Sequence, residues 1–135
     1  MAEKEVKTTN EDEKRTEELL KELVDYYGEE VKEVYMKHKD EDIYVYIFND
    51  DSLYLFTPIK NSEYREIQRK AYETSVTEGL SKEEVEKTLI VKGFTIYPEL
   101  QMGDLDDMPA GKFETLYDLI MKASHFNTQN PVLAL

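Results

Sequence analysis

Two histidines and a group of aspartates are the residues that could bind a metal. His38 and His125 are the only histidines, and they lie too far apart in the sequence for the spacing of a zinc site. Asp104, Asp106 and Asp107 could attract calcium, but their segment lacks the alternating ligands, central glycine and closing glutamate of a calcium-binding loop. These aspartates instead suit the positive end of the dipole of a helix that follows them. We therefore predict no metal site.

The sequence also lacks the motifs of nucleophilic catalysis and of phosphate binding. None of the serines stands in a nucleophile-elbow sequence, and the chain has no cysteine that could act in place of a serine. None of the five glycines belongs to a loop that could cradle a phosphate. The 30 acidic residues single out no pair of carboxylates for acid–base chemistry. We therefore predict a protein that is not an enzyme and that needs no cofactor.

Length and charge limit the class of protein. The 135 residues suffice for one domain with its own core, and no apolar run approaches the roughly 18 residues that span a bilayer. The N-terminal segment lacks the apolar core of a secretion signal, which favours the cytoplasm. The net charge of −13 repels phosphate backbones and anionic membranes, so we expect neither nucleic acid nor membrane as a partner. The charge fits a well-hydrated surface, a surface complementary to a basic partner or a mimic of nucleic acid, and general charge arguments favour the first. Because the acidic residues are scattered, the sequence does not separate the three.

A β-hairpin over residues 43–56 is the strongest structural signal. Two runs of β-branched and aromatic residues, 43–48 and 53–56, flank the polar turn 49–52. Side chains alternate between the faces of a strand, and here both faces are apolar. Because a two-stranded ribbon cannot bury two faces by itself, helices or a partner must cover the second face. The hairpin therefore indicates packing or assembly more than chemistry.

An apolar stripe before the hairpin predicts a helix from about Glu13 to Gly28, where the glycine ends it. Residues 31–38 either continue this helix or form a strand that leads a three-stranded meander. We favour the strand, because a glycine weakens a helix interior and residues 39–42 suit a tight turn.

The predicted fold class is α+β, a small antiparallel β-hairpin or three-stranded meander packed with about four α-helices. The later elements are a helix over 62–76, a helix from a Ser81–Glu84 capping box to Gly93, an extended connector at 94–98, a loop at 101–111 and a last helix from about Gly111. We predict a disordered N-terminal tail over residues 1–11, a single domain over residues 12–126 and a loose C-terminal tail over residues 127–135.

The aromatic content indicates a protein-binding surface. The chain has ten tyrosines and five phenylalanines, of which half or more must fill the core of so small a domain. Stacking on nucleic acid would need a basic groove, which the composition does not favour. We therefore predict that Tyr44, Tyr46, Tyr54 and Phe56 bind a protein partner, and a homo-oligomer is compatible with this surface.

Several short segments occur in an order that is similar to a known family. They are the aromatic segments 42–48 and 53–58, a helix that opens with residues 62–67, the pair Tyr97-Pro98, the step Pro109-Ala110-Gly111 and a last helix that ends near Ser124-His125-Phe126. Over residues 42–126 this order resembles the tail assembly chaperones of tailed bacteriophages, which are encoded beside the tape measure protein. Thr57 stands where many members of that family carry an arginine.

The resemblance implies binding without catalysis, in the host cytoplasm during virion assembly. The implied partners are the tape measure protein, whose apolar helical faces the chaperone would cover, and tail tube subunits, which it would help to recruit. Two alternatives remain open. A small structural protein of the tail, neck or capsid would stay in the virion, and an acidic inhibitor or mimic would bind a host nucleic-acid enzyme.

Overall fold

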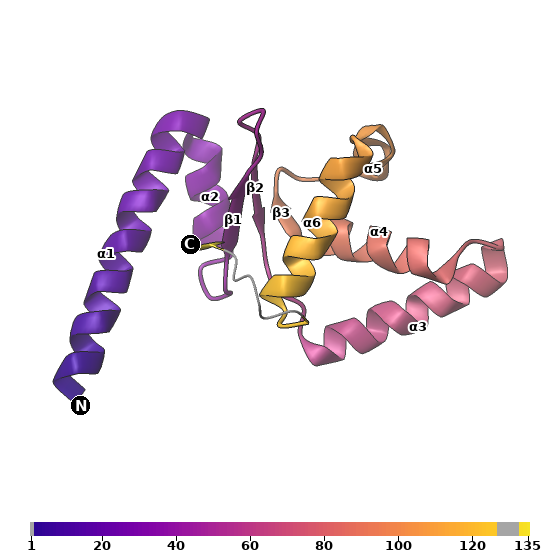
Figure 1. The fold of residues 1–135 in the computed structure, drawn as a ribbon, viewed down its shortest axis with the longest axis horizontal. Helices are drawn as coiled ribbons and strands as arrows, with labels where there is room; N and C mark the ends of the chain where they lie inside the picture. The colour runs from indigo at the N-terminus through magenta and orange to yellow at the C-terminus, as the bar shows by residue number, and fades with distance from the viewer. Residues whose placement is uncertain (1, 127–132) are drawn as a thin grey trace. The chain divides into compact units, whose positions relative to one another are not determined.

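The chain folds into helices and one antiparallel sheet (Figure 1). It divides into two compact units. The computed structural model describes residues 2–126 and 133–135. One unit contains the described residues up to Glu41 together with Leu135, and the other spans Asp42–Ala134, so the stretch predicted as one domain is shared between them. The predicted α+β class is confirmed. Within the described residues, no helix is long and apolar enough to cross a membrane.

The first unit consists of two helices, α1 (Ala2–Tyr27) and α2 (Glu29–Lys37). Gly28 separates them with a φ of 106°, a conformation that favours glycine, so the predicted stop is confirmed. Helix α1 also includes residues 2–11, for which the sequence predicted a disordered tail. The residues of the predicted apolar stripe are buried or half-buried in α1; they are Leu19, Leu20, Leu23, Val24 and Tyr27. Thr16 is also half-buried among residues 14–27.

The preference for a strand within residues 31–38 is wrong, because this segment forms α2. Burial recurs there at helical positions: Val31 is fully buried and Val34 and Tyr35 are half-buried, whereas Met36 is 53 % exposed. The helical spacing of these apolar residues therefore prevailed over the β propensity of the valines. The glycine that argued against one continuous helix separates two helices instead.

The predicted hairpin forms the centre of the sheet in the second unit. The strands are β1 (Tyr44–Ile47), β2 (Leu53–Phe56), β3 (Thr95–Tyr97) and β4 (Leu133–Ala134), in the order β3-β2-β1-β4. Strands β1 and β2 pair antiparallel, with Tyr44 opposite Phe56. Strand β3 pairs antiparallel with β2, and it lies in the segment that the sequence predicted as an extended connector at 94–98. The two-residue β4 extends the sheet beside β1.

The second unit contains four helices, so the chain has more helices than the predicted number of about four. They are α3 (Asn61–Glu78), α4 (Lys82–Phe94), α5 (Met102–Asp107) and α6 (Ala110–Ala123). Helix α5 lies where the sequence predicted a loop at 101–111. Leu105 is buried, and the Asp104 carboxylate accepts a hydrogen bond from the Gln101 N–H at 2.8 Å. Capping and one buried anchor therefore stabilise this short helix.

The predicted loose tail over residues 127–135 falls mostly outside the described residues. The structure describes its last three residues, and Leu133 and Ala134 form β4.

Helices of the same unit cover one face of the hairpin. Phe56 is fully buried in a cluster with Ile59, Ile90, Leu119, Ile120 and Ala123. Tyr54 is buried in a second cluster with Val91, Leu100, Leu105 and Leu116. Because these partners come largely from α4 and α6, the cover that the sequence required for this face is supplied by the protein itself.

We expect the hydroxyl of Thr95 on β3 to lower the stability of the fold. It is buried, and its Oγ1 has no hydrogen-bond partner within the described residues. Thr95→Val keeps the shape of the side chain and removes the unpaired hydroxyl, so we expect the free energy of unfolding to rise by roughly 1 kcal/mol. Urea unfolding measures the change, and Thr77→Val at an exposed position is the control. A lower unfolding midpoint for Thr95→Val would show that the hydroxyl has a partner.

Candidate functional site

The four aromatic residues predicted to bind a partner occupy different environments. Phe56 is 0 % exposed and Tyr54 is 7 % exposed, so both are core residues and offer no surface to a partner in this structure. Tyr44 is half-buried and its ring stacks on Phe56, with 6.0 Å between the centroids. Tyr46 is 36 % exposed and packs edge-on against Phe48. Of the four, Tyr46 therefore offers the most surface.

The histidines and the aspartates considered for metal binding do not come together. His38 Nδ1 lies 2.5 Å from the Glu41 carboxylate in the first unit, and His125 follows α6 in the second. Asp104 caps the start of α5. Within residues 2–126 and 133–135, no group of three or more histidine, cysteine, aspartate or glutamate side chains could hold a metal ion.

Asp50, Ser52 and Lys112 form a polar cluster between the hairpin turn and the first turn of α6. Lys112 Nζ lies 2.5 Å from Asp50 Oδ2 and donates to Ser52 Oγ at 3.0 Å. The Ser52 hydroxyl donates to Asp50 Oδ1 at 2.6 Å. A lysine that activates a serine must accept its proton, whereas this lysine is paired with a carboxylate and donates to the serine. The cluster is therefore suited to anchoring the turn to α6 rather than to nucleophilic attack.

Because of the cluster of Asp50, Ser52 and Lys112, we expect the free energy of unfolding to depend on pH. Hydrogen bonds from Lys112 and Ser52 hold the pKa of the Asp50 carboxyl well below its usual range. A carboxyl whose pKa is lower in the folded state than in the unfolded state stabilises the fold at pH values above its unfolded-state pKa. This stability is lost as the pH falls through the folded-state pKa. We expect Lys112→Met to return the pKa of Asp50 toward its usual range, measured by NMR titration of the carboxyl carbon. Lys82→Met, at an exposed site, is the control.

A usual pKa for Asp50 in the unaltered protein would contradict this anchor. In the variant, we also expect acid unfolding to depend less steeply on pH over the range in which Asp50 titrates.

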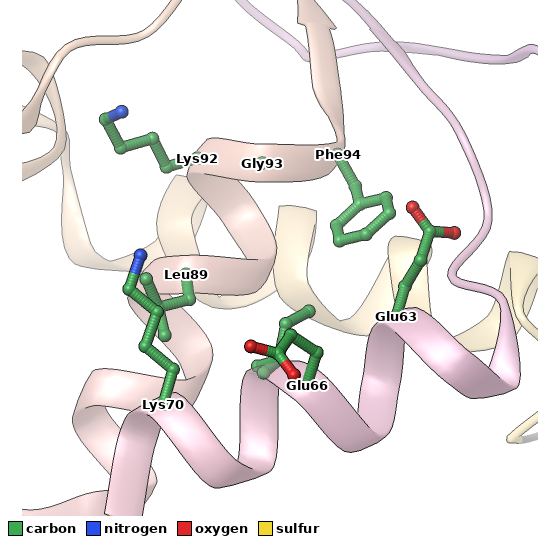
Figure 2. A pocket seen from close by; sticks show the side chains of 8 residues that line it. Glu63, Glu66, Lys70, Leu89, Lys92, Gly93 and Phe94 are labelled. Atoms are coloured by element: carbon green, nitrogen blue, oxygen red, sulfur yellow. The ribbon is translucent and has the colours of Figure 1, made fainter. Parts of the chain in front are cut away.

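A groove runs along one side of the helical hairpin formed by α3 and α4. Two cavities of about 440 Å³ and about 290 Å³ lie along it, and both are lined by Leu89 and Lys92. The lining residues of the first are Glu63, Glu66, Ile67, Lys70, Leu89, Lys92, Gly93 and Phe94 (Figure 2). The second adds Thr74, Glu78, Leu80, Glu84, Val85, Thr88 and Met102. Because residues of both α3 and α4 line each cavity, and Leu89 and Lys92 line both, we treat the two cavities as one surface, named the α3–α4 groove.

Helical spacing explains why these residues share a groove. Along α3 the lining positions 63, 67, 70, 74 and 78 recur every three or four residues, which places them on one face of the helix. Gly79 ends α3 with a φ of 70°, and Ser81 Oγ accepts a hydrogen bond from the Glu84 N–H at the start of α4. Only this serine half of the predicted capping box is present. The turn between the two caps brings α4 back along α3 (Figure 1).

The groove has an apolar floor and charged walls. Ile67, Leu89 and Phe94 line the larger cavity and are half-buried, whereas its charged lining residues are exposed, so these three supply the floor. Phe94 lies beside Glu63 (Figure 2). Lys70 from α3 and Lys92 from α4 extend on the same side of this cavity (Figure 2). Within the described part of the chain, neither lysine forms an ion pair. The surface can therefore bind an apolar group and counterions, and it presents no nucleophile held beside a base.

Sequence reasoning did not predict this groove. Each of the two predicted helices carries an apolar stripe, one around Ile67 and one around Leu89, and a sequence pattern does not distinguish such a stripe from a core face. Lys70 and Lys92 carried no signal of their own. The pairing of the two stripes across the turn, which the sequence alone does not specify, creates the site. Comparison of the chain with protein-family models, with curated proteins and with solved structures finds no match.

Proposed function

We propose that this chain is a non-catalytic assembly chaperone of a bacteriophage tail, which binds helical segments of the tape measure protein in the α3–α4 groove. The groove is the observation that supports binding, and the resemblance over residues 42–126 supports the phage context. Its lining extends along α3 from Glu63 to Glu78, which at 1.5 Å per residue corresponds to about 22 Å. That length accommodates about four turns of a helix laid into the groove.

An amphipathic helix is a suitable occupant, because it presents an apolar stripe to a groove and keeps its polar face in water. The apolar floor would cover the stripe of the tape measure helix and so prevent its aggregation before the tube assembles. The net charge of −13 would keep a complex with many bound copies soluble. Recruitment of tail tube subunits and release on polymerisation complete the proposed role.

Gly93 allows a test that leaves the fold intact. It lines the groove near the end of α4, and a Cβ added there meets no atom within 4 Å. Gly93→Gln places a bulky side chain into the groove, and glutamine is a better helix former than glycine. We expect the variant to keep its Tm and to lose at least about tenfold in affinity for tape measure fragments, by isothermal titration calorimetry. It should also fail to suppress their aggregation, by light scattering.

Gly111→Gln is the matched control, because Gly111 is also helical and open but lies outside the groove lining. Unchanged binding by Gly93→Gln would contradict the use of this groove. Mass spectrometry of purified particles tests the role itself: a chaperone should be absent, whereas stoichiometric copies would identify a structural protein of the virion.

A further inference from the structure

We infer that the α3–α4 groove selects its helix by a charge pattern, with basic residues at both ends of the bound segment and acidic residues at its centre. This inference rests on the proposed function and specifies the partner's chemistry at that same site. It comes from the order of the charged residues along the groove, which the apolar floor alone does not determine.

Carboxylates line both ends of the groove. Glu63 and Glu66 lie at the end where α3 begins, and Glu78 and Glu84 lie at the end where α3 turns into α4. Both carboxylates at the first end are partly compensated. Glu63 accepts a hydrogen bond from the Lys60 N–H at 3.1 Å, and Glu66 pairs with Arg69, which also lies 2.5 Å from Glu73. The two carboxylates at the other end form no ion pair within the described residues. A bound helix therefore meets negative charge at each end.

Two lysines occupy the centre of the groove. Lys70 lies between Glu66 and Thr74 along the lining face of α3, and Lys92 borders both cavities from α4. In a chain with 30 acidic and 17 basic residues, two lysines beside an apolar floor differ from the overall negative charge, and neither forms an ion pair within the described residues. An acidic side chain of the partner would pair with them at low cost, because binding would remove water from both groups only in part.

The charge order is the same from either end of the groove, negative at both ends and positive at the centre. A helix that carries the complementary order can therefore bind in either chain direction. A partner with many similar amphipathic segments could use this tolerance, since each segment needs the right charge spacing but not one orientation. Nucleic acid does not fit, because its phosphates would meet carboxylates at both ends.

Two synthetic peptides of about 18 residues test the charge pattern. Both have the same composition and the same leucine stripe. One has lysines in its end turns and glutamates in its middle turns, and the other exchanges these positions. Fluorescence anisotropy at low salt should show that the first peptide binds about tenfold more tightly, and that high salt reduces this preference.

The double variant Lys70→Glu/Lys92→Glu should lose the preference. Lys37→Glu/Lys39→Glu, which makes the same change of charge at exposed sites in the other unit, should keep it. Equal binding of both peptides, abolished by Gly93→Gln, would overturn the charge pattern and leave the proposed function standing. Binding of neither peptide would overturn both. Self-association of the protein that Gly93→Gln abolishes would identify a second copy as the occupant and overturn the inference.

Discussion

Replacing Phe56 by alanine is expected to lower the free energy of unfolding by about 3–5 kcal/mol, the largest effect that we predict for a single substitution. The Phe56 side chain is fully buried and packs against residues of α4 and α6, and its ring stacks on Tyr44. Alanine would leave a cavity between the sheet and these helices, which the surrounding close-packed side chains fill only in part.

Thermal and urea unfolding measure this loss, which corresponds to a fall in Tm of roughly 10 °C or more. Tyr72→Ala is the control, because Tyr72 also loses an aromatic ring but is 62 % exposed on α3. We expect it to change stability by less than about 0.5 kcal/mol. If Phe56→Ala left stability intact and weakened binding to a partner, the sequence-based interpretation of Phe56 as a binding residue would be correct and its placement in the core would be wrong.

Replacing Ser124 by alanine is expected to lower the free energy of unfolding by about 1–3 kcal/mol. Ser124 follows the last residue of α6, and its Oγ accepts a hydrogen bond from the Ile59 N–H at 2.7 Å. The same hydroxyl donates to the Ile120 carbonyl at 2.7 Å. Because Ile59 is buried, its N–H would lose its partner without gaining water in exchange.

The site-specific measurement is hydrogen exchange of the Ile59 amide, which should become faster in Ser124→Ala by more than global destabilisation explains. Ser62→Ala, at an exposed position at the start of α3, should change neither the exchange rate nor the Tm. Continued protection of the Ile59 amide at unchanged stability would contradict the role of Ser124 in joining the segment after β2 to α6.

Local patterns predicted much of the secondary structure correctly. The hairpin at 43–56 follows from two β-prone runs around a polar turn, and Gly28 and Gly79 end helices where their positive φ angles favour glycine. These features depend on residues that are close in the chain, so a sequence pattern contains the information for them.

Elements that depend on distant contacts were predicted less well. Helix α5 carries a poor helix sequence and is stabilised by Leu105 inserting into a core cluster that Tyr54 and Leu116 also form. Residues 31–38 had two patterns that fitted locally, and burial at helical positions distinguishes them only in the folded chain. In both cases tertiary packing outweighed propensity.

Residue types and their spacing are enough to show that this protein is acidic, that it contains a hairpin with two apolar faces, and where several of its helices end. The packing of the helices on the sheet is what makes Tyr54 and Phe56 core residues and forms a groove between α3 and α4. A sequence pattern cannot show this, because an apolar side chain has the same signature whether it faces a partner or the core. Its role depends on which face of which helix packs opposite, and that is set by contacts between residues far apart in the chain.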